Sequence, residues 1–213
     1  LRHSSAASDV YKRQAINVLK KKRGRRNVEN ALLKAIEKDP FWGVRKEAVQ
    51  GLASLKSKQH SDVLMNLSDG QDNRVRRAIW NALRNYKNND DVSTFLQNVV
   101  STDSKYYSVS DAFRALVAVD TAAARKKVDA LLVRDSHQDV IRSAAISFFG
   151  SVKSDKNYNR LKELASYGGT TWDARPEAVS QLSRYAKEKR ETIDIFVNLL
   201  EDRSRDVRRR AIY

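Results

Sequence analysis

The chain has no cysteine, and only two prolines and seven glycines among its 213 residues. The lack of cysteine excludes disulfides, thiolate zinc sites and thiol chemistry. The low content of proline and glycine favours helices joined by short turns over a strand-rich fold. No apolar run approaches the length of about 18 residues that a transmembrane helix needs, so the sequence predicts no membrane span. With 41% hydrophobic and 31% charged residues, the composition is typical of a soluble folded chain with a modest core.

Motifs for catalysis and metal binding are also missing. None of the three histidines has a second histidine three or four residues away, and no His-Glu-x-x-His, Gly-x-Ser-x-Gly or phosphate-binding glycine loop occurs. His60 and His137 fall between helical patterns, where exposed turn residues are expected. The carboxylate pairs Asp90–Asp91 and Glu201–Asp202 fall at helix ends, which favours capping. The sequence therefore predicts no catalytic, cofactor-binding or metal-binding residue in this chain.

Positive charge is in excess, with a formal net charge of +15. Its densest run is "KKKRGRR" at 20–26, which predicts either a solvated basic helix end or a contact for an anion such as a phosphate backbone. The candidate anion-contact residues are Lys20, Lys21, Lys22, Arg23, Arg25 and Arg26.

A repeat of about 33 residues organises the rest of the chain, as expected for solenoids. A register position recurs with steps of 31, 33, 33, 33 and 33 residues, and Arg follows it in five of six cases. Four residues later Ala recurs, and apolar residues at plus five, eight and eleven complete one helix face. The register positions are Val44, Val75, Ser108, Ile141, Ala174 and Val207.

A second amphipathic segment precedes each register position, so each unit is a helix A, a short corner and a helix B. Neither helix can bury its apolar face alone, and stacked units share one core. The fold class predicted is an all-α, right-handed α-solenoid of about six helical hairpins, the last one truncated. We expect a repeat domain over 15–213 that is a fragment of a longer chain. Residues 1–14 are expected to be a non-native or disordered tail, like those attached to frames assembled from environmental sequence reads.

This pattern resembles HEAT repeats, in which corner Asp and helix-B Arg residues form a ladder of hydrogen-bonded pairs along the solenoid. The resemblance implies a structural ladder, interrupted in the third unit where Val109 replaces Arg. Arg142 and Arg175 are expected to lie partly buried, bonded to corner Asp side chains or carbonyls of the same or an adjacent unit. The ladder residues it implies are Arg45, Arg76, Arg142, Arg175, Arg208, Asp39, Asp69, Asp135 and Asp202.

Two aromatic residues, Phe41 and Trp42, occupy the corner of the first clear unit, and Trp172 occupies the matching corner of the fifth. Such rings could line a ligand pocket or fill the core where two helices meet. Because the aromatic recurs at the corner, the sequence favours a core role.

Nucleic-acid binding is an alternative function, since a basic helix-B face could follow a phosphate backbone. The exposed helix-B positions, at plus two and plus six, carry a mixture of residues and no continuous basic stripe. Binding to nucleic acid is therefore expected to be weak. The plus-two residues are Lys46, Arg77, Ser110, Ser143, Pro176 and Arg209, and the plus-six residues are Gln50, Asn81, Arg114, Ser147, Ser180 and Tyr213.

The block "DPFWGVR" at 39–45 is similar to the opening HEAT-like unit in the C-terminal region of bacterial membrane-alanyl-aminopeptidase-family zinc enzymes. The resemblance implies a scaffold that braces a catalytic domain and shapes peptide access, in a bacterial cytoplasm or periplasm. Its partners would be that catalytic domain and the peptide substrate, and zinc would bind in the parent's catalytic domain. Neither the zinc motif nor the substrate-recognition loop of that family is present here. A free-standing protein-interaction scaffold is the other interpretation.

Overall fold

The computed structural model describes residues 2–19, 26–55 and 59–212. Over these residues the chain forms thirteen α-helices and two short 3-10 helices, with no strand. It divides into two compact units, residues 1–120 and residues 121–213. The prediction of an all-α solenoid built from helical hairpins is confirmed.

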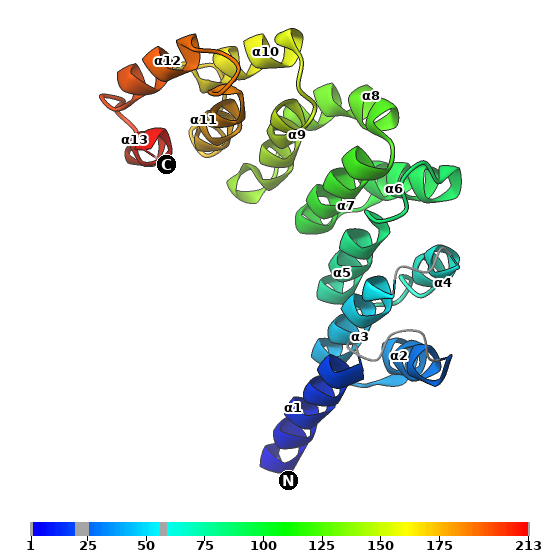
Figure 1. Cartoon of the computed structure of the whole chain (residues 1–213). Coiled ribbons are helices and arrows are strands. Elements are labelled where there is room, and N and C mark those ends of the chain that lie inside the picture. Colours follow the sequence, from blue (N-terminus) through cyan, green and yellow to red (C-terminus); the bar gives the residue numbers. More distant parts are fainter. Residues whose placement is uncertain (1, 20–25, 56–58, 213) are drawn as a thin grey trace. The chain divides into compact units, whose positions relative to one another are not determined.

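The first unit contains seven α-helices, which alternate between the B and A positions of the hairpins. Their bounds are α1 (Arg2–Leu19), α2 (Arg26–Lys38), α3 (Trp42–Ser54), α4 (His60–Asn66), α5 (Asn73–Leu83), α6 (Asp90–Thr102) and α7 (Tyr106–Val119). The B helices pack in chain order, α1 on α3, α3 on α5 and α5 on α7. The A helices α2, α4 and α6 lie together on one side of this row (Figure 1).

The second unit contains three further hairpins. Their helices are α8 (Thr121–Leu132), α9 (Val140–Ser151), α10 (Asp155–Ala165), α11 (Arg175–Leu182), α12 (Glu191–Leu199) and α13 (Arg205–Ile212), with the 3-10 helices η1 (His137–Asp139) and η2 (Ser183–Tyr185). Again the B helices pack on one another, α9 on α11 and α11 on α13, and the A helices α8, α10 and α12 lie to one side (Figure 1).

The core follows the sequence register. All six register residues are buried near the start of a B helix, and the residues four positions later are buried in the first five hairpins. Several helices begin at a side chain that accepts a hydrogen bond from the helix's own backbone. Asp72 caps α5, Asn89 caps α6 and Ser154 caps α10. These caps satisfy N–H groups that the first turn of a helix leaves without a partner.

Residues 2–14 belong to α1, although a non-native or disordered tail is expected over 1–14. The helix packs on α3, buries Ile16, and pairs Lys12 with Asp39 and Arg13 with Glu47. The period of 33 residues places Lys12 where the other units carry Arg. The register residue of this helix is Tyr11, which is exposed, whereas the other register residues are buried. The repeat pattern therefore did not predict this helix. The expected domain boundary at residue 15 falls inside α1.

Candidate functional site

The arginine that follows the register position donates a hydrogen bond to the end of helix A in its own unit. Arg142 Nε donates to the carbonyl of Leu132 at 2.6 Å, and Arg175 Nε donates to the carbonyl of Ala165 at 2.8 Å. Each acceptor is the last residue of an A helix, α8 or α10, where carbonyl groups lack partners inside the helix. The arginine thus joins helix B to the end of helix A.

The same column of cations reaches the corner aspartate of the following unit, 27 residues later. Arg76 Nη2 donates to Asp103 Oδ2 at 2.6 Å. Arg175 makes two bonds to Asp202, at 3.0 and 2.5 Å, and both side chains are buried. Lys12 takes the same place in α1, with its Nζ 3.0 Å from Asp39. These pairs therefore join α1, α5 and α11 to the corner of the following hairpin.

Each of these three aspartates also accepts a backbone hydrogen bond within its own corner. The carboxylates of Asp39, Asp103 and Asp202 accept from the N–H two residues later, at 2.8–2.9 Å. Burial would raise the pKa of Asp202, but hydrogen bonds from Arg175 and from the Ser204 N–H outweigh it and hold that pKa below its ordinary value. The pKa of Asp103 is lowered in the same way, with burial opposed by bonds from its corner and from Arg76.

Several pairs implied by the HEAT resemblance do not form. Asp69 accepts from the Gly70 N–H, and Arg76, its expected partner, binds Asp103. Arg45 does not pair with Asp39, and its Nε is buried without a partner. Arg208 donates to the backbone carbonyl of Asp202 in its own unit and not to the Asp202 carboxylate, which binds Arg175.

The reason is the position of the aspartate within the corner. An Asp five residues before the register reaches the previous unit, as the three paired residues do. Asp69 and Asp135 stand six residues before it. Asp135 is exposed and binds Arg142 within its own unit, where Arg142 also pairs with Asp139. Val109, where an interruption was expected, is a buried apolar residue of α7 that cannot donate.

A groove of about 640 Å³ lies over the exposed side of α3 and α5 and reaches α7 at Asp111. Small residues at Ala53, Ala78 and Ala82 leave it open, because their side chains end close to the helix backbones. Its polar lining includes four of the plus-two and plus-six residues named from the sequence. The polar and aromatic residues that line it are Trp42, Lys46, Gln50, Arg74, Arg77, Asn81, Asn85 and Asp111.

Two arginines that line the groove each lie over an aromatic ring, Trp42 within the groove lining and Tyr107 outside it. Arg74 Cζ lies 4.3 Å from the Trp42 ring centroid, and Arg77 Cζ lies 4.9 Å from that of Tyr107. Trp42 is half-buried and lines the groove, so the prediction that it fills the core is wrong. Its neighbour Phe41 packs over Gly43, where a Cβ would lie 2.5 Å from the Phe41 ring.

The matching tryptophan of the fifth unit also lies outside the core. Trp172 is 58% exposed in the corner between α10 and α11, and nearby Tyr167 is 68% exposed. This corner is longer than the others and turns at Gly168, which has a φ of 77°. Trp172 lies in this longer corner and is exposed, whereas Trp42 lies in a short corner and is half-buried. Matching corner positions therefore differ in burial.

Charge in the groove is mainly positive. Lys46, Arg74 and Arg77 line it, whereas Asp111 is its single acidic lining residue. Arg77 Nε donates to Asp111 Oδ2 at 2.5 Å, which neutralises that arginine in part. Lys46 and Arg74 have no ion pair with any residue that the structure describes.

The candidate anion-contact residues from the sequence are not among the residues that line the groove. Lys20, Lys21, Lys22, Arg23 and Arg25 fall outside the described residues, and Arg26 is the exposed first residue of α2.

His60 is buried, contrary to the expectation of an exposed turn. Its Nε2 lies 2.6 Å from Glu29 Oε1, because α4 begins at His60 and directs the ring toward α2. His137 is exposed in η1, as expected.

Two features are absent from residues 2–19, 26–55 and 59–212. No group of three or more His, Asp or Glu side chains within them is arranged to hold a metal ion. No helix within them combines the length and hydropathy that crossing a membrane requires.

Comparison with known proteins identifies the repeat. No curated protein matches the chain. Among solved structures, an engineered protein from the Northeast Structural Genomics Consortium is 20% identical, with a TM-score of 0.46, over 86% of this chain and 95% of that one. The family model described as HEAT repeats matches residues 3–84 and 28–117, which together span more than half of the chain. The chain therefore belongs to the HEAT-repeat family.

Proposed function

We propose that this chain is a non-catalytic HEAT-repeat scaffold that binds a segment of another protein in the groove across α3, α5 and α7. The observation that supports the proposal is the groove itself, which is built from three consecutive B helices of unit 1. Sites on helices that pack against one another present their side chains in a fixed arrangement. Trp42, Arg74 and Arg77 are residue types that dominate binding energy at protein interfaces.

A displayed library of random peptides tests this function without knowledge of the natural partner. The full chain is used for selection, and enriched peptides are then measured against Asn81→Trp. Asn81 is exposed in the groove, so a tryptophan there blocks the groove without changing its charge. We expect the enriched peptides to lose most of their affinity for this variant.

A matched variant separates the groove from the rest of the surface. Asn159→Trp places the same bulky side chain on α10, at an exposed position in unit 2. It should leave peptide binding unchanged. Selected peptides that bind wild type, Asn81→Trp and Asn159→Trp equally would show that the groove is not the binding site.

A finer proposal concerns the scaffold's parent protein. The residues 39–45 resemble the HEAT-like region of membrane-alanyl-aminopeptidase-family zinc enzymes, which supports a role in bracing a catalytic domain and limiting peptide access. In that arrangement the partner segment would belong to the catalytic domain of the same longer protein. The zinc and the catalytic groups would also be in that domain.

Enzyme assays on two proteins test the finer proposal. The chain alone, supplied with zinc, should not hydrolyse an aminoacyl-p-nitroanilide, because this chain has no His-Glu-x-x-His to hold an open metal site. A longer reading frame containing the chain should carry that motif and release N-terminal amino acids. A longer frame without the motif and without activity would leave only the free-standing scaffold.

A further inference from the structure

The cations of the groove are arranged to meet carboxylates. Lys46 comes from α3, and Arg74 and Arg77 come from the first turns of α5, so the charges lie across two neighbouring helices. Asp111 on α7 opposes only Arg77, at 2.5 Å. The groove therefore retains a positive charge at Lys46 and Arg74, and an acidic ligand complements it.

The aromatic ring that lines the groove, Trp42, favours a carboxylate ligand over a nucleic-acid base. A base would need a free ring face on which to stack. Here Arg74 lies over the Trp42 ring at 4.3 Å. Arg77 lies over Tyr107, which is outside the groove lining, at 4.9 Å. A guanidinium held over a ring still directs its N–H donors outward in its own plane, where carboxylate oxygens can accept them.

The remaining polar residues suit a peptide backbone. Gln50, Asn81 and Asn85 are exposed amides that line the groove. An amide side chain both donates and accepts, as an extended peptide backbone does. Neighbouring helix axes lie about 8–10 Å apart, so three B helices span roughly 20 Å, the length of about six extended residues.

We propose that the groove binds an extended acidic peptide segment, with its carboxylates at Lys46 and Arg74 and its backbone along the amides. This inference rests on the proposed interaction function and adds the chemistry of the partner. The single acid, Asp111, acts against such a ligand by pairing Arg77 and by repelling carboxylates.

Fluorescence anisotropy with defined peptides tests the inference on the full chain. The probe is a fluorescein-labelled Ser-Glu repeat peptide long enough to cross the groove, with Ser-Gln and Ser-Lys repeats of equal length for comparison. We expect the Ser-Glu peptide to bind most tightly. The double variant Lys46→Gln, Arg74→Gln should bind it about tenfold more weakly, since two charge contacts are lost.

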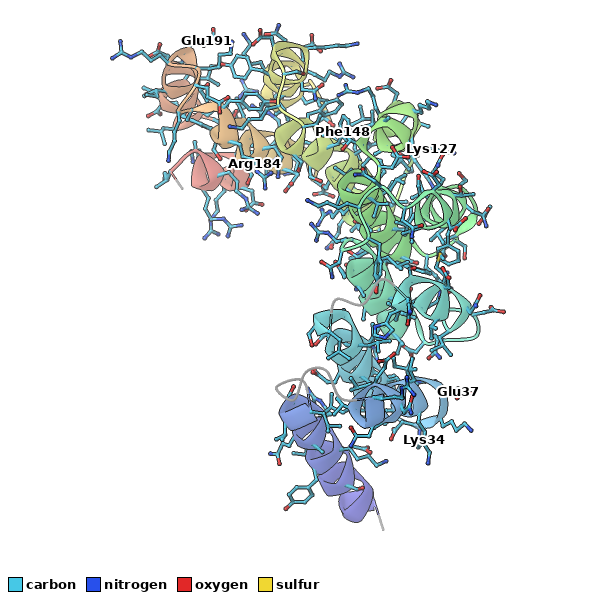
Figure 2. All side chains as sticks on the ribbon, turned by 45° about the vertical axis from the view of Figure 1, so that its right-hand side comes forward. Lys34, Glu37, Lys127, Phe148, Arg184 and Glu191 are labelled. Atoms are coloured by element: carbon cyan, nitrogen blue, oxygen red, sulfur yellow. The ribbon has the colours of Figure 1, made fainter. Side chains whose placement is uncertain are left out.

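Two further variants distinguish the groove from general attraction to a basic chain. Lys34→Gln with Lys87→Gln removes the same charge from unit 1 at exposed positions outside the groove; Lys34 lies on α2 (Figure 2). This variant should bind as wild type does. Asp111→Asn should bind the Ser-Glu peptide about threefold more tightly, because it removes the opposing charge. A purely structural role for Asp111 would give weaker binding.

Other outcomes would overturn the inference in recognisable ways. Equal weakening by both double variants would indicate non-specific electrostatic binding. Tighter binding of the Ser-Gln or Ser-Lys peptide, abolished by Asn81→Trp, would reject an acidic partner and keep the groove as a protein-binding site. Tighter binding of an oligothymidylate that is lost in Lys46→Gln, Arg74→Gln would favour nucleic acid. If none of the probes binds, the acidic-peptide inference is wrong, and the peptide-library selection decides the proposed function separately.

Discussion

The arginines that follow the register positions differ in what they stabilise. Only some of them pair with the corner aspartate of the following hairpin. Arg76 donates to the buried carboxylate of Asp103, whereas the Nε of Arg45 is buried without a partner. Removing a cation from a buried pair leaves its acceptor unsatisfied, while removing an unpaired polar group costs little. Identical positions in the repeat therefore have different energetic roles.

Two substitutions in unit 1 measure this difference. Arg76→Met should lower the free energy of unfolding by about 1–3 kcal/mol, because Asp103 keeps its charge and loses its cation. Arg45→Met should change it by less than about 0.5 kcal/mol. Urea denaturation followed by circular dichroism gives both values. Equal losses in the two variants would show that pairing with the next corner is not what stabilises the unit.

Acid should weaken the second unit through Asp202. Its pKa is lowered in the folded chain, so the pair with Arg175 stabilises the fold at a pH above the ordinary Asp value of 3.8. This contribution is lost as the pH falls through the lowered folded pKa. Asp202→Asn should therefore be less stable than wild type at neutral pH, and the gap should close in strong acid. Melting curves from pH 7 to pH 2 check this, and a gap that stays constant over that range would contradict it.

At the scale of helices, α1 is an element of the repeat array. It packs on α3 and supplies Lys12 to the corner at Asp39. Deleting residues 1–14 would leave a segment too short to remain helical by itself. We expect this deletion to lower the free energy of unfolding of unit 1 by about 2 kcal/mol, the value of burying a side chain such as Ile16. An unchanged melting temperature would support a non-native or disordered tail over residues 1–14.

The hairpins and the exposed helix-B positions could be predicted from the sequence, because both depend on a period that is local to each helix. Lys46, Gln50, Arg77 and Asn81 were placed on the exposed side and do line the groove. Pairing between units was harder to predict. Whether a corner Asp meets the previous arginine depends on one residue of corner length, as Asp69 illustrates. The stacking of Arg74 on Trp42 depends on how α5 packs against α3, which no single-helix pattern contains.

For the whole molecule, the net charge of +15 is weaker evidence than where the charges lie. In the described residues the groove combines cations with amides and one acid, and it offers no continuous row of cations to a phosphate backbone. We expect weak binding to nucleic acid without sequence preference, and a steep loss of affinity as salt rises. A mobility-shift titration checks this. Tight binding that persists at about 200 mM salt would favour nucleic acid as the natural partner.

Hydrogen–deuterium exchange of the full chain, with and without a peptide selected from the library, tests the central claim most directly. If the B helices of unit 1 bind a protein segment, exchange should slow in α3, α5 and α7 when the peptide is bound. Exchange in the A helices α2, α4 and α6 should stay the same, as it should in unit 2. Protection confined to A helices or to unit 2, with none in α3, α5 and α7, would contradict the account.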